Sequence, residues 1–312
     1  MNKSSETKQN ITPVLTSSFL SSLSFSSVSS FSSPASSSSL SLFTPEHVLK
    51  FNEIKNNIEK LKNILYQNGF KTLLDESFTD WTAERFLKKN NFNHLNTLED
   101  IVKTFKWRQE WNVHSLNEQQ FCKEFYEFAG IDLMERHSST NELVVWMTSR
   151  YSSIGNDCLD NHVKNFLHYQ LELVDRQAGR DGVILVIDCK YFNHNSINLN
   201  LCKHTLEIIS AHYPSLFRSV IIINLGTLWR GLAAFVMNWL TNDLQNIVQI
   251  IHYKQLKQTL PVELIYQYYG GNRSYHVSIP TDKTFQQFCW FKKLSKAQQK
   301  QIFSVLCSFH KN

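Results

Sequence analysis

The sequence predicts an α/β fold in which a helical N-terminal module precedes a largely parallel β-sheet with flanking helices. From about residue 44 to residue 130, apolar residues recur every three or four positions, a period typical of amphipathic helices. After that point two β-branched runs, Val183–Ile187 and Val220–Ile223, are separated by a helical segment. This is the pattern of a βαβ unit with parallel strands and a right-handed crossover. The 312 residues leave room for one large domain or two ordinary ones.

Residues 1–43 form a Ser-rich arm that the composition predicts to be disordered. Ser fills 16 of the 28 positions from Thr16 to Phe43, and no charged residue lies between Lys8 and Glu46. The serines interrupt the apolar residues too often for a signal-peptide core or a membrane span, and a transit peptide would contain arginines, which this arm lacks. A polar, low-complexity tract of this kind cannot bury enough apolar surface to fold.

Residues 44–130 are expected to form a helical module. The first helix begins at Thr44-Pro45-Glu46, where a capping residue is followed by Pro and a first-turn acid, and it ends near Gly69. Its apolar residues step by three and four: Val48, Phe51, Ile54, Ile58, Leu61 and Leu65. Further helices are predicted over about 80–90, from Thr97 onward, and over about 118–128.

Residues 131–272 are expected to form the sheet domain, and residues 273–312 a polar tail with a short helix near 295–309. Buried strands are predicted where apolar residues run without interruption, at 143–147, 183–187, 220–223 and 247–251. Helices are predicted over about 157–178, ended by Gly179, and over about 199–213.

The segment Leu228–Leu240 is the most unusual part of the sequence. As a helix it is apolar on nearly every side, with Arg230 as its only charged residue. It is too short to cross a bilayer, which needs about 20 such residues. The segment is therefore predicted either to be buried on all sides or to cover an apolar space.

Charge and cysteine spacing exclude several classes of site. The formal net charge of +5 is mild and the basic residues form no run, so nucleic-acid binding is not expected. The six cysteines form no Cys-x-x-Cys pair, which argues against a disulfide framework or zinc knuckle and favours a reducing compartment. Cys189, His194, Cys202 and His204 come nearest to a metal-like grouping, and we interpret them as ordinary thiols and imidazoles. No cofactor and no metal are expected.

No catalytic constellation is recognisable, so the protein is predicted not to be an enzyme. Asp181 and Asp188 flank a strand but have no partner that would mark an acid–base pair. Ser215 lacks the Gly-x-Ser-x-Gly elbow of the hydrolases. His212 lies at a helix end, where an imidazole commonly satisfies free carbonyl groups.

Four segments, in this order, resemble the CRAL-TRIO family of lipid-binding proteins. They are Arg85–Asn93 with the helix that ends at Arg108, then Asp181–Asp188, His212–Asn224 and Leu260–Gly271. Within the family, Thr97–Glu118 is most similar to the branch that joins this domain to a motile-sperm domain and a membrane anchor, although the sequence carries neither of these additions.

The resemblance implies that a mixed sheet forms the floor of a deep apolar cavity and that Leu228–Leu240 is a gate helix above it. Apolar and aromatic side chains of the sheet and its helices would then line the cavity: Trp146, Phe166, Tyr169, Leu173, Ile187, Ile209, Ile223, Trp229, Phe235, Val236, Trp239 and Leu240.

Two positions depart from the phosphatidylinositol-transferring members of the family. Ser215 stands where those members carry Glu, and Asn246 stands where they carry Lys. The two changes together argue against an inositol phosphate headgroup held in the family's geometry. Arg230, Lys254 and Lys257 are candidates for a substitute headgroup contact, the alternative being a solvated rim.

The function expected from these features is non-enzymatic binding, and intermembrane transfer, of a hydrophobic small molecule or phospholipid in a gated cavity. The chain is expected to be cytoplasmic and to associate peripherally and transiently with a membrane surface. The alternative is a domain with a vestigial cavity that serves as a protein-interaction or membrane-docking module. The sequence indicates no oligomeric state.

Overall fold

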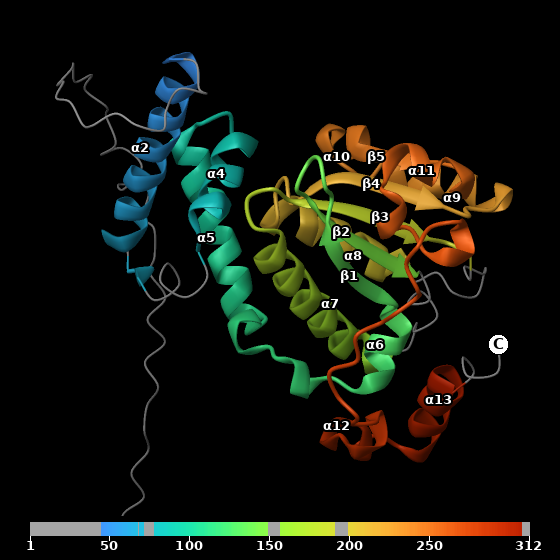
Figure 1. Ribbon diagram of the computed structural model, residues 1–312. Coiled ribbons are helices and arrows are strands. Elements are labelled where there is room, and N and C mark those ends of the chain that lie inside the picture. The colour runs from blue at the N-terminus through green and yellow to red at the C-terminus, as the bar shows by residue number, and fades with distance from the viewer. Residues whose placement is uncertain (1–44, 68, 72–77, 149–156, 191–198, 308–312) are drawn as a thin grey trace, which may run out of the picture. The chain divides into compact units, whose positions relative to one another are not determined.

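The computed structural model describes residues 45–67, 69–71, 78–148, 157–190 and 199–307 (Figure 1). The chain divides into two compact units, Met1–Glu99 and Asp100–Asn312. Within the described residues, no helix combines the length and the apolar character needed to cross a bilayer. The domain boundaries expected at residues 43, 130 and 272 stay predictions.

The first unit contains α2 (Pro45–Gln67), α4 (Asp80–Lys89) and the first turns of α5 (His94–Glu110). α2 and α4 pack against each other and bury apolar residues on both helices: Ile58, Leu61, Leu65, Ala83, Phe86 and Leu87. α5 begins three residues before the predicted Thr97. The Asn93 side chain accepts hydrogen bonds from the backbone N–H groups of Leu95 (3.1 Å) and Asn96 (3.2 Å), so Asn93 is the residue that caps this helix.

The second unit is built on a five-stranded sheet with the strand order β1-β2-β3-β4-β5. The strands are β1 (Ile131–Arg136), β2 (Leu143–Thr148), β3 (Val183–Asp188), β4 (Phe217–Ile223) and β5 (Val248–Ile250). The pairs β2–β3, β3–β4 and β4–β5 are parallel, and β1 runs antiparallel to β2. The sheet is therefore mixed and largely parallel, which confirms the predicted α/β fold class.

Edge strand β1 was not among the strands predicted from the sequence. It follows α6 (Lys123–Ala129) directly, through Gly130 in the left-handed conformation (φ 52°). Its first four residues alternate between half-buried and buried, with Asp132 and Met134 buried, and its last two residues, Glu135 and Arg136, are exposed. A strand of this length with a charged end does not form the continuous apolar run that identifies a central strand.

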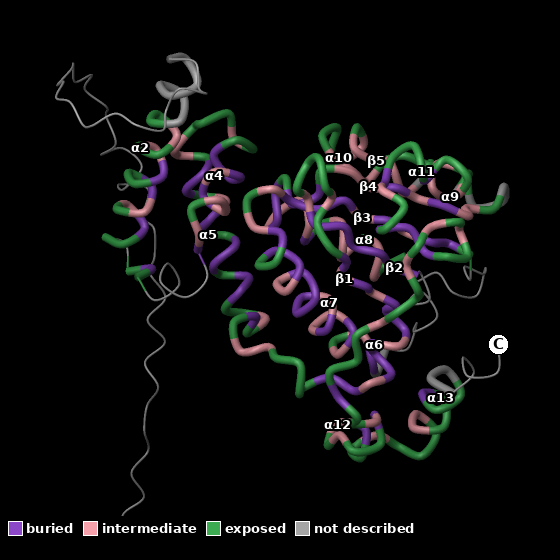
Figure 2. Tube along the Cα trace, viewed as in Figure 1, coloured by how far each residue is buried: buried purple, intermediate pink, exposed green. Residues whose placement is uncertain are grey.

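The two faces of the sheet are covered by different elements. One face carries Trp146 and Ile223 and packs against η5 (Tyr253–Gln255), α11 (Leu256–Thr259), η6 (Val262–Leu264) and η7 (Gln267–Tyr269). The other face packs against α7 (Asp157–Ala178) and α8 (Leu199–His212). Figure 1 shows α7 and α11 on opposite sides of the sheet, and Figure 2 shows that much of the middle strands is buried.

A second cluster of apolar side chains lies beside the amino-terminal half of α7. The predicted helix over 118–128 is divided here into η2 (Glu118–Gln120) and α6. The chain returns to this region in η8 (Phe285–Gln287), α12 (Cys289–Lys292) and α13 (Lys296–Cys307). The main buried residues of the cluster are Phe121, Phe125, Phe128, Phe166, Phe285, Phe291 and Ile302.

A buried ion pair joins α5 to α7. The Arg108 guanidinium donates to both carboxylate oxygens of Glu172, at 2.7 and 3.0 Å, and the Tyr213 hydroxyl donates to the same carboxylate. Burial is the largest single influence and works to lower the pKa of Arg108. The charge of Glu172 and its hydrogen bond, together with Tyr213 and Asp175, outweigh burial, and the net shift of the pKa is upward. The guanidinium therefore stays charged in its buried position.

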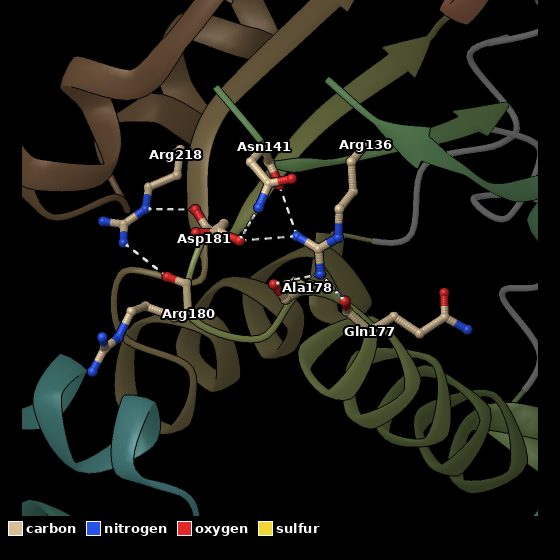
Figure 3. Close-up of polar contacts among 7 residues, drawn as sticks. All are labelled: Arg136, Asn141, Gln177, Ala178, Arg180, Asp181 and Arg218. Carbon is tan, nitrogen blue, oxygen red and sulfur yellow. Dashed lines mark hydrogen bonds and ion pairs between the residues drawn. The ribbon is translucent and has the colours of Figure 1, made fainter. Parts of the chain in front are cut away.

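The carboxyl end of α7 is held by a polar cluster at the amino ends of β2, β3 and β4 (Figure 3). Arg136 donates from one nitrogen to the backbone oxygens of Gln177 (2.6 Å) and Ala178 (3.2 Å), which are free carbonyls of the last helical turn. Its other terminal nitrogen pairs with Asp181 (3.1 Å). Arg218 donates to the backbone oxygen of Asp181 (3.2 Å), so β1 and β4 are both tied to the loop after α7.

Candidate ligand cavity

A cavity of about 280 Å³ lies between the sheet and the helices on the α7–α8 face. Residues from all five strands and from four helices line it. They are Ile131, Val145, Met147, Leu167, Gln170, Leu171, Val174, Leu185, Ile187, Thr205, Leu206, Ile209, Phe217, Val220, Ile222, Ala233, Val236, Met237, Leu240, Leu244, Ile247, Val248 and Ile250.

The floor of the cavity consists of two rows of side chains that cross the sheet. Strand register places one row across β2 to β5 at Val145, Leu185, Val220 and Val248. The second row starts on β1 and contains Ile131, Met147, Ile187, Ile222 and Ile250. Because side chains alternate between the faces of a sheet, these rows share one face, and every residue in them is apolar.

Of the described side chains that line the cavity, only two are polar. Thr205 on α8 donates its hydroxyl hydrogen to the backbone oxygen of Leu201 (2.7 Å), so its donor is satisfied inside its own helix. Gln170 on α7 has no hydrogen-bond partner among the described residues, although the residue is 94% buried, with 6% of its surface exposed.

The cavity is closed on one side by α9 (Thr227–Met237), the turn after it and α10 (Asn242–Ile247). The amide of Gln245 holds the turn by donating to the backbone oxygens of Met237 (3.0 Å) and Leu240 (3.1 Å). The outer side of α9 includes exposed Arg230 and Ala234. α9 ends at Met237, three residues before Leu240, the predicted end of the gate helix.

Four of the twelve predicted lining residues border the cavity: Ile187, Ile209, Val236 and Leu240. Trp239 is half-buried and does not border it. The side chains of Trp229 and Phe235 lie outside the part of the chain that the structure describes.

Five predicted lining residues lie elsewhere in the second unit. Trp146 and Ile223 point to the opposite face of the sheet, where the Trp146 indole donates to the backbone oxygen of Leu264 (3.0 Å). Phe166 and Tyr169 belong to the cluster around α6, and Leu173 borders a separate pocket described below. The physical reason is the same in each case: β2, β4 and α7 are apolar on two sides, and only one side of each faces the cavity.

A network of polar side chains lies at the carboxyl ends of β3 and β4, directly before α9. Asn224 donates to Asp188 (2.8 Å), and the Tyr269 hydroxyl donates to the other oxygen of the same carboxylate (2.7 Å). Asp188 also accepts the backbone N–H of Lys190 (3.0 Å), so the carboxylate organises a turn. Burial, and then the hydrogen bond to Asp188, raise the pKa of Tyr269, which keeps the hydroxyl protonated.

The three candidate headgroup residues do not converge on the cavity. Arg230 is exposed on α9. Lys254 and Lys257 are exposed on η5 and α11, which cover the opposite face of the sheet. Ser215 and Asn246, the positions that depart from the phosphatidylinositol-transferring pattern, are both exposed.

His212, His204 and His168 lie among aromatic residues beside α5, α7 and α8. His212 stacks on Trp107 (ring centroids 4.3 Å apart), and its Nδ1 lies 3.0 Å from the Thr104 hydroxyl. His204 Nε2 lies 3.2 Å from His168 Nε2. Within the described residues no three His, Cys, Asp or Glu side chains are grouped as metal ligands would be; His194 falls outside those residues.

Residues 135–271, which include most of this cavity, match the family model of the CRAL/TRIO domain. The chain contains a CRAL-TRIO domain. Relatives of the domain include the CRAL-TRIO domain-containing protein YKL091C of Saccharomyces cerevisiae, which is 22% identical over 282 residues, or 78% of this chain and 84% of the relative.

Two further comparisons concern a phosphatidylinositol transfer protein and a solved structure. The phosphatidylinositol transfer protein SFH5 of Coccidioides immitis is 24% identical over 163 residues, which cover 45% of this chain and 36% of the relative. The crystal structure of Sfh5 superimposes with a TM-score of 0.53 at 16% identity and covers 81% of this chain and 98% of that chain. The structural similarity to Sfh5 supports the CRAL-TRIO fold.

Proposed function

We propose that the protein binds a hydrophobic ligand, a phospholipid or a similar lipid, in the cavity between the sheet and α7–α10, and carries it between membranes. The observation that supports this proposal most strongly is the chemistry of the cavity wall, where all but two of the described lining side chains are apolar. The name of the fungal phosphatidylinositol transfer protein relative supports lipid transfer as the class of function.

The cavity is suited to an acyl chain on energetic grounds. Moving a methylene group out of water is worth ~0.8 kcal/mol, so a chain of about 16 carbons gains roughly 13 kcal/mol before ordering costs are subtracted. The cavity volume of about 280 Å³ is close to the lower end of the range of about 300–1,000 Å³ common for ligand pockets.

We assign the role of gate to α9 in this proposal. Ala233, Val236 and Met237 face the cavity, so part of the inner side of α9 meets an empty space where a core helix would meet packed side chains. Moving such a helix outward sacrifices fewer packing contacts than moving a helix of the core would. An apolar helix that opens also finds a favourable environment at a membrane surface, where we expect ligand exchange to occur.

The experiment compares Val236→Asp with Ala234→Asp in the full chain. Both substitutions introduce a carboxylate on α9, but Val236 borders the cavity and Ala234 is exposed. Lipids extracted from each purified protein are quantified by mass spectrometry. We expect about one lipid per protein in the wild type and in Ala234→Asp, and a loss of most of it in Val236→Asp, with similar melting temperatures in all three.

Two results would contradict the proposal, and a third would move the test to another variant. The wild type could carry no lipid and take none up from vesicles, which would favour the docking module with a vestigial cavity. The two variants could carry equal amounts of lipid, which would place the ligand elsewhere. Val236→Asp could unfold, in which case Ile222→Trp, which fills the cavity without a charge, must still reduce loading for the proposal to hold.

A further inference from the structure

A second pocket of about 400 Å³ adjoins the apolar cavity at the β1 edge of the sheet. Its lining comes from η2, α6, β1, α7 and the segment after η7: Glu118, Tyr126, Ala129, Ile131, Asp132, Leu133, Tyr169, Gln170, Leu173, Gln177, Arg273, His276, Ser278 and Pro280. About half of these side chains are polar, which distinguishes this polar pocket from the cavity. Ile131 and Gln170 line both spaces, so the two are neighbours.

The position of Gln170 follows from the geometry of α7. Leu167, Leu171 and Val174 border the cavity, whereas Leu173 and Gln177 border the polar pocket. These are adjacent stripes of one helix, because positions three and four residues apart share a face. Gln170 belongs to both stripes and therefore lies at the junction of the two spaces.

The amide of Gln170 meets open space at this junction. Only 6% of the residue is exposed, and no described residue hydrogen-bonds its amide. The amide is not among the fully enclosed side-chain groups that lack a partner, because the residue borders both pockets. It is therefore available to hydrogen-bond a ligand, or water when no ligand is bound.

The charges around the polar pocket disfavour an anionic group. Asp132 is buried and already pairs with Arg273 (3.4 Å), while it also accepts the Tyr266 hydroxyl (2.8 Å). Glu118 is exposed at the pocket and adds a second carboxylate. An anionic group would thus meet two carboxylates, the His276 imidazole and one guanidinium that is already paired.

The hydroxyl groups of the pocket favour an uncharged partner. The Tyr126 hydroxyl donates to the backbone oxygen of Glu118 (3.2 Å) and also hydrogen-bonds the Tyr169 hydroxyl. The Gln170 amide can both donate and accept. A ligand hydroxyl also does both, so it complements an unpaired amide better than a carboxylate, which only accepts, or an ammonium, which only donates.

We infer that the polar pocket binds the uncharged, hydroxyl-bearing head of a lipid whose acyl chain occupies the apolar cavity, with Gln170 hydrogen-bonding the head at the junction. This inference rests on the proposed lipid-binding function and narrows its ligand to a neutral class such as the acylglycerols. It also assigns the head to the β1 edge of the sheet, and not to Arg230, Lys254 or Lys257.

The test compares ligands that share one acyl chain and differ in the head. Monooleoylglycerol and methyl oleate both contain the oleoyl ester, but only the first carries hydroxyl groups, and oleate carries a charge. Affinities of the full-length protein are measured by displacement of a fluorescent acyl probe. We expect the wild type to bind monooleoylglycerol roughly tenfold more tightly than methyl oleate, as a few net hydrogen bonds would give, and oleate no better than methyl oleate.

Two variants examine the site itself. Gln170→Leu keeps the approximate volume but removes the amide, and Leu173→Phe reduces the space of the polar pocket. Each is expected to lower the preference for monooleoylglycerol over methyl oleate to less than about twofold, since the hydroxyl contacts are lost. Gln286→Leu, an exposed glutamine on η8, is the matched control and should keep the wild-type preference.

The outcomes separate this inference from the proposed function. Equal affinities of the wild type for monooleoylglycerol and methyl oleate would overturn the inference and leave lipid binding intact, as would tightest binding of oleate. A preference that survives in both variants would overturn it as well. If none of the three ligands displaces the probe from the wild type, the inference and the proposed function both fail.

Discussion

The side-chain amide of Asn224 donates a hydrogen bond to Asp188 (2.8 Å), and this contact joins the carboxyl ends of β3 and β4. Only Leu225 and Gly226 separate Asn224 from the first residue of α9. The hydrogen bond therefore fixes the point from which the proposed gate would move. Asn224 itself has a left-handed backbone (φ 57°), a conformation that Asn tolerates better than most residues.

Replacing Asn224 is expected to weaken the attachment of the gate. Asn224→Ala loses a hydrogen bond to a carboxylate and keeps the left-handed strain, so it should destabilise folding by about 2–3 kcal/mol. Asn224→Gly loses the same hydrogen bond without the strain and should cost about 1 kcal/mol less. Both variants should exchange bound lipid with vesicles several-fold faster than the wild type. Wild-type exchange rates in both variants would show that this contact does not restrain α9.

Arg108→Ala should be among the most damaging single substitutions in the second unit. It leaves the Glu172 carboxylate, which Arg108 and Tyr213 together hold in a largely buried position, without its cation. Breaking a buried pair in this way costs about 3–5 kcal/mol, measured as a change in the free energy of unfolding in urea. Lys103→Ala removes an exposed cation from the same helix and should cost less than about 0.5 kcal/mol. A cost below 1 kcal/mol for Arg108→Ala would contradict the structural role assigned to the pair.

Stability should fall in acid because of His168. Burial, followed by the charges of His204, His212 and Lys164, lowers the pKa of His168 to about 3. The unfolded chain, with a pKa near 6.5, therefore binds a proton over the window from about pH 6.5 to pH 3 that the folded chain does not. Stability is fully present above pH 6.5 and decreases by up to about 1.4 kcal/mol per pH unit below it.

The contribution of His168 is isolated by His168→Phe, which retains an aromatic ring against Trp107 and Trp111. The free energy of unfolding of this variant should depend less steeply on pH between 6 and 4 than that of the wild type. His114→Phe, at an exposed position, serves as the control. Parallel pH profiles for the wild type and His168→Phe would refute the assignment.

Gln170→Leu should impair selectivity and leave the stability of the ligand-free protein nearly unchanged. The wild-type amide borders two open pockets and has no hydrogen-bond partner among the described residues, so an apolar group of similar size replaces it without breaking a described hydrogen bond. The free energy of unfolding should change by less than about 1 kcal/mol. Delipidated protein is compared by urea unfolding. A loss of about 2 kcal/mol or more would indicate that the amide is satisfied within the folded chain.

The sheet and its main helices could be predicted because their sequence signals are local. The run Val183–Ile187 is apolar throughout, as a strand buried on both faces must be, and the helix predicted over 157–178 has the observed bounds. β1 escaped prediction because an edge strand needs no continuous apolar run. Its antiparallel pairing with β2 depends on the reversal of the chain and on packing, and the six residues of β1 alone do not indicate either.

The strands were easy to predict because they are apolar on both faces, and the same property made the cavity lining hard to predict. In a strand that is apolar on both faces, composition does not tell which residues face which side, and Trp146 is one residue away from Val145, which lines the cavity. The register of the helix-facing rows depends on the whole sheet. The polar pocket was beyond sequence reasoning, because it unites Glu118, Gln170 and Arg273 from distant parts of the chain.

Photocrosslinking tests the central claim most directly, because it reports where a bound lipid lies. A lipid with a diazirine in mid-chain is loaded into the full-length protein, irradiated, and its adducts are mapped by peptide mass spectrometry. The account predicts adducts on the cavity-facing residues of α8 and α9, namely Leu206, Ile209, Val236 and Met237. Adducts confined to residues 253–269 on the opposite face of the sheet, or a lipid that attaches nowhere in the domain, would contradict it.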